Sequence, residues 1–199
     1  FGNLRYLDLS RNNITKIIKN AFDGTSLQEL YVWENEIASM ESMAFEGVNL
    51  LELDLSRNNI RNIVRNAFSG TSIQILELWK NQIRFIDPLD FEGLNLLALD
   101  SSNNRLSNIQ KDMFLGMSVK KLQLRQNQIE MIEPGSFACV RNLQTLDLSY
   151  NQMHTIFPYT FNGSLVDTID LSFNLISSIK PAGFDNLTKH RELAGERFK

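Results

Sequence analysis

Leucine and isoleucine alternate with polar residues in a fixed order that returns along nearly the whole chain. The first copy is Leu4-x-x-Leu7-x-Leu9-x-x-Asn12-x-Ile14, in which x varies and is usually polar. Eight copies follow one another at steps of 23 residues, with one step of 24 before the seventh copy. Self-similarity at a period of about 20–50 residues is the signature of a solenoid built from stacked supersecondary units. The pattern therefore predicts eight stacked repeats.

Alternation within each copy predicts a short strand. Successive side chains of a strand face opposite sides, so Leu7 and Leu9 are expected to point into the core while Asp8 and Ser10 point outward. The remaining residues of each repeat, about 15, supply the long return path that a parallel strand needs. We therefore expect residues 1–187 to form a parallel sheet with one strand from each repeat.

Two residue types mark fixed positions in the repeats. An asparagine closes each predicted strand, and because its amide both donates and accepts hydrogen bonds, we expect a structural ladder that satisfies loop backbone from repeat to repeat. A phenylalanine follows each asparagine by ten residues, and this regular spacing favours a buried spine, at about 1.5–3 kcal/mol per ring, over a ligand-binding stripe. The asparagines are Asn12, Asn35, Asn58, Asn81, Asn104, Asn127, Asn151 and Asn174, and the phenylalanines are Phe22, Phe45, Phe68, Phe91, Phe114, Phe137, Phe161 and Phe184.

These residues resemble the leucine-rich repeat pattern L-x-x-L-x-L-x-x-N-x-L, in the typical extracellular subtype that carries a late phenylalanine. The resemblance implies an α/β repeat solenoid. In this fold a curved horseshoe segment carries a parallel sheet on its concave face and irregular or short helical segments on its convex face. The resemblance extends to Toll-like receptor ectodomains and to chaoptin-like adhesion proteins.

A second period of 46 residues lies beneath the first. The segment 8–14 recurs identically as 54–60, and Trp33 and Trp79 share this spacing. The duplicated unit is therefore a pair of repeats, and alternate strands are alike.

Outward strand positions carry the candidate binding residues, because packing already explains the inward positions. Large or charged side chains replace the usual Asp and Ser in repeats two, four and six. Trp, Tyr and Arg dominate binding hot spots, and an exposed tryptophan is costly to keep in water. The alternative is that these long side chains merely cover the sheet. The candidate partner-binding residues are Tyr31, Trp33, Ile75, Glu77, Trp79, Lys121 and Arg125.

Composition limits the kinds of partner and active site expected for this chain. The 199 residues carry a net charge of −3, which argues against nucleic acid as a partner. Two histidines, one cysteine and no phosphate-binding or nucleophile motif predict neither an enzyme nor a cofactor or metal site. Alternating acids such as Asp8 and Asp54 would stand about 10 Å apart, too far to share one cation. The chain has no apolar run of the roughly 20 residues that cross a bilayer.

Three sequons point to an extracellular chain with N-linked glycans at Asn13, Asn162 and Asn186. The typical repeat subtype implies the same compartment by resemblance.

The lone Cys139 is expected to be a small buried residue of a convex loop. Ser101 stands where other repeats place Leu or Val, so we expect a loosely packed, inward hydroxyl there. Residues 188–199 abandon the repeat and predict a charged tail or a lid.

The function expected from these features is non-enzymatic protein binding. The first hypothesis is cell-surface recognition or adhesion through the concave sheet, with a protein ligand or a second copy of the chain as partner, the latter giving a homodimer. Two alternatives are innate-immune ligand recognition and an intracellular scaffold that regulates an enzyme. The absence of cysteine-rich caps favours a segment of a longer secreted or membrane-tethered protein.

Overall fold

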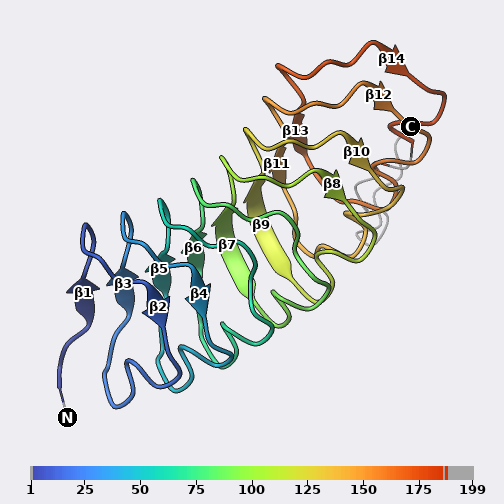
Figure 1. The fold of residues 1–199 in the computed structure, drawn as a ribbon. Helices are drawn as coiled ribbons and strands as arrows, with labels where there is room; N and C mark the ends of the chain where they lie inside the picture. Colours follow the sequence, from blue (N-terminus) through green and yellow to red (C-terminus); the bar gives the residue numbers. More distant parts are fainter. Residues whose placement is uncertain (1, 186, 188–199) are drawn as a thin grey trace, which may run out of the picture.

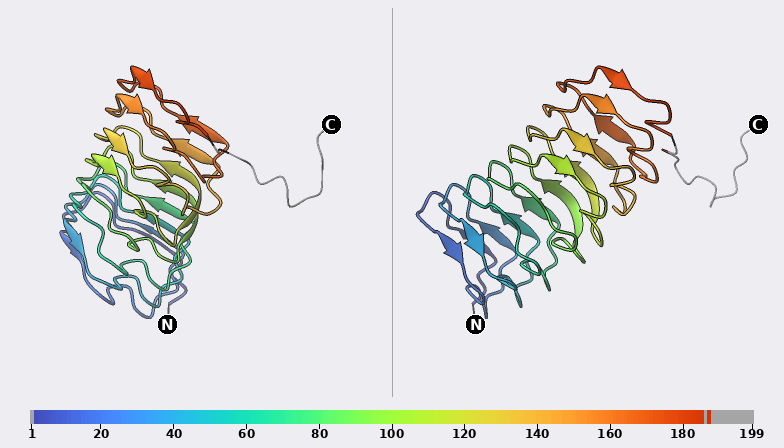
Figure 2. Two further views of the ribbon diagram at one scale, coloured as in Figure 1. Left: turned by 90° about the vertical axis from the view of Figure 1, so that its right-hand side faces the viewer. Right: turned by 45° about the vertical axis from the view of Figure 1, so that its right-hand side comes forward.

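The computed structural model describes residues 2–185 and 187, which form a curved stack of parallel turns (Figures 1 and 2). One strand from each repeat enters an eight-stranded parallel sheet on the concave side (Figure 1). Neighbours in the sheet are consecutive repeats, as the short return path of each repeat requires. In order the strands are β1 (Tyr6–Asp8), β3 (Glu29–Tyr31), β5 (Glu52–Asp54), β6 (Ile75–Glu77), β7 (Asn95–Asp100), β9 (Ser118–Gln123), β11 (Thr145–Asp147) and β13 (Thr168–Asp170).

The convex side carries only two-residue strands and turns. The short strands pair as β2 with β4, β8 with β10 and β12 with β14. Residues 2–185 and 187 contain no helix, so the irregular form of the expected convex segments is the one observed. Left-handed turn residues such as Asn20 (φ 62°) and Gly24 (φ 71°) break the return path before a helical run can form. The six strands are β2 (Lys16–Ile17), β4 (Ser39–Met40), β8 (Asn108–Ile109), β10 (Met131–Ile132), β12 (Thr155–Ile156) and β14 (Ser178–Ile179).

The phenylalanine column forms a stacked spine inside the solenoid. The rings of Phe22, Phe45 and Phe68 stack with centroids 6.0 and 6.1 Å apart and nearly parallel planes. The same stacking continues from Phe114 through Phe137 at 6.0 Å. Rings in the middle of the array are fully buried, whereas the terminal rings are only partly covered. Each of these rings therefore packs against the equivalent ring of a neighbouring repeat.

The asparagine column joins consecutive repeats through hydrogen bonds. Asn58 Nδ2 donates to Val32 O of the preceding repeat at 3.0 Å and to Leu55 O of its own repeat at 3.1 Å, while its Oδ1 accepts from Ile37 N at 3.0 Å. Equivalent bonds recur at Asn35, Asn81, Asn104, Asn127, Asn151 and Asn174.

The first member of the column differs. Asn12 is exposed and donates only to carbonyls of its own repeat, because no repeat stacks against its outer side. The 24-residue repeat does not interrupt the column. Asn151 still reaches Leu124 O of the preceding repeat at 3.0 Å. The extra residue of this repeat therefore does not change the position of Asn151 in the column.

Ser101 points into the core, as its place in the repeat predicts. Its side chain is fully buried, and Oγ has no hydrogen-bond partner among the described residues. The flanking repeats place Leu78 and Leu124 at the same position. The predicted tail or lid at 188–199 and the sequon residue Asn186 lie outside the described residues.

Candidate functional site

Three carboxylates stand side by side at the centre of the concave sheet. Asp54, Glu77 and Asp100 occupy the same register position on the neighbouring strands β5, β6 and β7. Neighbouring strands are about 4.8 Å apart, so these side chains are close enough to interact strongly. We call these three residues the acidic trio. Sequence reasoning singled out only Glu77; the order of the outward column contained the signal for its two neighbours.

The environment of Glu77 is unfavourable for a charged carboxylate. Burial, followed by the carboxylates of Asp100, Asp54 and Glu52, raises the pKa of Glu77 to about 7. The positive charge of Lys121 on β9 acts in the opposite direction and lowers this pKa. A cation arriving at the acidic trio would therefore relieve repulsion that the free protein retains.

Tyr31 forms the N-terminal flank of this acidic region. Its hydroxyl donates to Glu29 Oε2 at 3.4 Å, and its ring lies 5.3 Å from the ring of Tyr6. Burial, followed by the nearby Glu52 and Glu29 carboxylates, raises the pKa of Tyr31 above its ordinary value. The phenol therefore stays protonated and remains a hydrogen-bond donor on this face.

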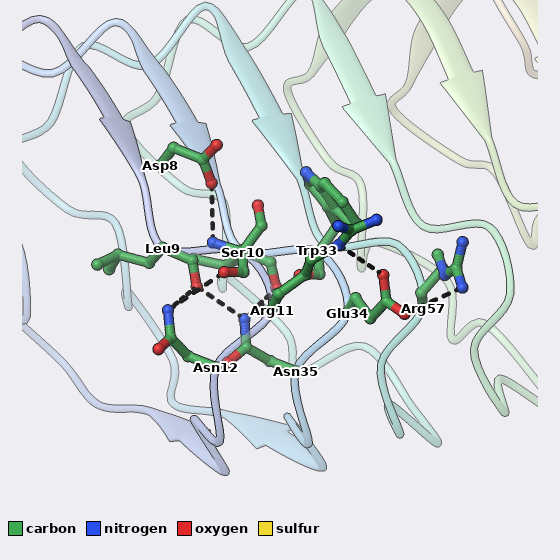
Figure 3. A network of polar contacts seen from close by, with 10 residues as sticks. Asp8, Leu9, Ser10, Arg11, Asn12, Trp33, Glu34, Asn35 and Arg57 are labelled. Atoms are coloured by element: carbon green, nitrogen blue, oxygen red, sulfur yellow. Dashed lines mark hydrogen bonds and ion pairs between the residues drawn. The ribbon is translucent and has the colours of Figure 1, made fainter.

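Each of the two tryptophans lies under an arginine, and Figure 3 shows this for Trp33 and Arg11. The Arg11 guanidinium lies 4.8 Å from the Trp33 ring centroid, and the Arg57 guanidinium lies 6.0 Å from that of Trp79. Glu34 accepts from Arg11 Nε at 3.2 Å and from Arg57 Nη2 at 3.1 Å. Both indoles are half-buried.

Several serines of the same outward column are buried or half-buried. Ser56 and Ser102 are buried, and the Oγ atoms of both, like that of Ser10, have no partner among the described residues. Along this column the order is Ser10, Trp33, Ser56, Trp79 and Ser102, so each of these serines has a tryptophan in an adjacent repeat. The tryptophans and these serines therefore alternate along the outward face of the sheet. Ser149 of the same column is also buried, although its neighbours in the column are Arg125 and Ser172.

A cationic and aromatic region follows toward the C-terminus. Lys121 and Arg125 are exposed, and the Arg125 guanidinium lies 4.5 Å from the Tyr150 ring centroid. Tyr150 stacks on Phe173 at 4.1 Å, and Phe173 is 68% exposed. These two aromatic residues were not among the candidate binding residues, although both follow outward positions of their strands.

The candidate residues therefore fall into two groups. Tyr31, Trp33, half-buried Ile75, Glu77 and Trp79 belong to repeats two to four, with the rest of the acidic trio beside them. Lys121 and Arg125 lie on and just after β9, two strands beyond β6. The concave surface thus changes sign along the array.

The described sequons differ in accessibility. Asn13 is exposed and donates to Glu36 Oε1 at 3.3 Å. Asn162 is half-buried, while Ser164 of the same sequon is buried. Cys139 is half-buried, and its pKa is raised by burial and then by Asp112, so its thiol lacks an activating environment.

No three His, Cys, Asp or Glu side chains between residues 2 and 185, or at 187, are placed to hold a metal ion. The same residues include no helix long and apolar enough to cross a membrane.

Comparisons with known proteins give the family. A family model described as leucine rich repeat matches residues 25–78, 95–153 and 141–194, and a second of the same description matches residues 3–24. No curated protein matches the chain. The solved structures similar to it include a Toll-like receptor ectodomain in the TLR13–ssRNA13 complex, with a TM-score of 0.74 and 26% identity over 82% of this chain. The chain spans about a quarter (24%) of the length of that receptor chain. From the repeats, the ladder and these matches together, the chain belongs to the leucine-rich repeat family.

Proposed function

We propose that this chain is a recognition segment of an extracellular or cell-surface protein, and that its concave surface binds a protein ligand. Leucine-rich repeats and a Toll-like receptor neighbour support a non-enzymatic binding or ligand-recognition role. The observation that carries the proposal is the acidic trio lying beside Trp33 and Trp79. Half-buried tryptophans next to unneutralised carboxylates combine the apolar and the charged parts of a binding hot spot.

The chemistry of this surface favours a ligand with a Lys or Arg side chain. A cation at the acidic trio would interact with Asp54, Glu77 and Asp100 together, and its aliphatic stem would pack on the indoles. Arg11, Arg57 and Glu34 already hold the indoles in place, so less side-chain entropy is lost on binding. The proposed ligand is therefore a cationic protein segment.

A second copy of the chain is one such ligand. The same concave surface carries the acidic trio on β5, β6 and β7 and the cations Lys121 and Arg125 near β9. An isologous pair would bring the acidic part of each copy toward the basic part of the other, which supports homophilic adhesion. Sedimentation at rising protein concentration tests this form: dimers that dissociate in high salt support it, and a monomer throughout opposes it.

Innate-immune ligand recognition is the second candidate function, favoured by the structural neighbour. That neighbour is a complex with single-stranded RNA. On this chain the acidic trio would repel a phosphate backbone, so a ligand of the concave surface is expected to be a protein rather than RNA. Loss of mass on glycosidase treatment of protein from a secretory host would support the extracellular forms. An unglycosylated, intracellular product would support an enzyme-regulating scaffold.

A peptide-binding experiment tests the proposal directly. The immobilised chain is exposed to synthetic peptides matched in length and differing only in net charge. We expect binding of the cationic peptide alone, and its loss in the Trp33→Ala/Trp79→Ala variant. The matched control is Phe85→Ala/Phe157→Ala. It removes two exposed aromatic rings from outside the concave sheet. Equal binding by all three proteins would contradict the proposal.

A further inference from the structure

Three arginines gather on one flank of repeats three to five, away from the concave surface. Arg61 and Arg84 occupy the same position in consecutive repeats, and Arg84 N donates to Arg61 O at 3.3 Å. Arg105 belongs to the following repeat, where its N donates to Ile83 O at 2.8 Å. All three side chains are exposed. This flank therefore concentrates positive charge on a chain whose net charge is −3.

The three guanidinium groups are not neutralised by acidic side chains. The salt bridges formed between described residues use Arg11, Lys16, Lys19 and Arg57, and none uses the three flank arginines. Glu130 stands at the same repeat position as Arg84, two repeats further on, and makes no ion pair with it. The donors of the three arginines therefore remain available to a ligand.

Two of these arginines line a hollow together with neutral polar side chains. Arg84, Arg105, Ser107 and Gln128 surround a space of about 370 Å³ between the asparagine column and the short convex strands. Guanidinium groups bind tetrahedral oxyanions through paired N–H donors, and the serine hydroxyl and glutamine amide add further donors. The volume falls in the range of small-ligand sites, about 300–1,000 Å³.

We infer that this hollow binds the sulfate ester of a sulfated glycan. Arg84 and Arg105 hold the sulfate oxygens, while Ser107 and Gln128 hydrogen-bond the sugar hydroxyls. Arg61 extends the cationic track for a second sulfate along the chain of the glycan. The site is separate from the concave surface, so it stands or falls independently of the proposed protein ligand.

The lining distinguishes a sulfated glycan from single-stranded nucleic acid. Sequence-tolerant binding of single strands combines a basic groove with aromatic rings on which bases stack. None of the four lining residues is aromatic. Hydroxyl and amide groups suit a sugar, whose surface carries many hydroxyls, better than they suit a base. The observations therefore favour the glycan.

Calorimetric titration with a heparin-derived hexasaccharide tests the inference. The Arg84→Gln/Arg105→Gln variant is expected to lose about tenfold or more in affinity, because two charge-assisted contacts are removed. The control Arg5→Gln/Lys120→Gln removes the same charge from two other exposed positions and is expected to bind as the unmodified protein does. The hexasaccharide without its sulfates is expected not to bind.

Three results would overturn the inference. Equal losses in both double variants would mean attraction to the overall charge rather than to this hollow. Undiminished binding by Arg84→Lys/Arg105→Lys would mean that point charges suffice and that the paired donors of arginine are unused. A short single-stranded RNA that binds as tightly as the hexasaccharide, and loses affinity in the same variant, would replace the glycan with nucleic acid.

Discussion

The guanidinium of Arg11 lies over the ring of Trp33, 4.8 Å from the ring centroid, and is tied to the next repeat by Glu34. Arg57 repeats the arrangement over Trp79 and binds the same carboxylate. One carboxylate therefore links two cation–π pairs, one between the first and second repeats and one between the third and fourth. This network orients both indoles before any ligand arrives, which reduces the entropy lost on binding.

Glu34→Gln is expected to loosen this network without unfolding the protein. The Glu34 side chain is 39% exposed, so losing its two ion pairs should cost no more than about 1 kcal/mol of unfolding free energy. The indoles should become more mobile, seen as lower anisotropy of tryptophan emission. Glu92→Gln, at an exposed convex position, serves as the control. Unchanged anisotropy in Glu34→Gln would mean that the indoles are held by other contacts.

The asparagine column is expected to dominate stability within the repeats. Asn81→Ala removes donors to Leu55 O and Leu78 O and leaves Ile60 N without its acceptor, all in buried surroundings. The expected cost is about 2–4 kcal/mol in denaturant unfolding, since each unsatisfied buried group costs about 1–3 kcal/mol. Asn12→Ala is the matched control. Because Asn12 is exposed, this substitution should lower the free energy of unfolding by well under half as much. Equal costs at the two positions would contradict the ladder.

Removal of the Ser101 hydroxyl is expected to stabilise the protein. Its Oγ is buried without a partner, so Ser101→Ala should raise the free energy of unfolding by about 1 kcal/mol. Ser101→Leu should raise the melting temperature further, because Leu78 and Leu124 occupy this position in the flanking repeats. Ser72→Ala, at an exposed position, should have no effect. A fall in stability in both Ser101 variants would show that the hydroxyl has a partner or that the site has no room.

Glu77 should make the stability depend on pH between about 4.5 and 7. Its folded-state pKa of about 7 exceeds the value of 4.5 for an unperturbed glutamate. The folded protein therefore binds more protons than the unfolded chain in this window, and its stability falls as the pH rises. At pH 8 the ionised Glu77 should cost about 1–2 kcal/mol after solvent screening, which Glu77→Gln should recover. Denaturant unfolding at pH 5 and pH 8 measures the difference. Identical pH dependence in the variant and in Glu130→Gln would contradict the assignment.

Periodicity predicted the core far better than the surface. The phenylalanine spine, the asparagine column and the inward Ser101 follow from positions in the repeat, because every repeat must solve the same packing problem. The burial of Ser56 did not follow, since it depends on side-chain packing between repeats.

The acidic trio was only partly predicted for the same reason. Strand order alone puts Asp54 and Asp100 beside Glu77. The sequence interpretation, however, considered acids in alternate repeats, such as Asp8 and Asp54, which lie two strands apart. The exposure of Asn12 depends on the end of the array rather than on its place in the repeat. The sequence does not distinguish irregular from helical convex segments, because it constrains turns more weakly than strands.

Titration of tryptophan emission with a cationic peptide tests the central claim most directly. Trp33 and Trp79 are the only two tryptophans of the chain, so the emission reports from the proposed binding surface itself. Octalysine is expected to change the emission saturably at pH 8 and to bind more weakly at pH 5.5, where Glu77 is protonated. Glu77→Gln/Asp100→Asn should lose most of the affinity, whereas Asp23→Asn/Asp185→Asn, which removes the same charge from exposed convex positions, should not. An emission unaffected by octalysine, or equal losses in both variants, would contradict recognition of a cationic ligand by this concave surface.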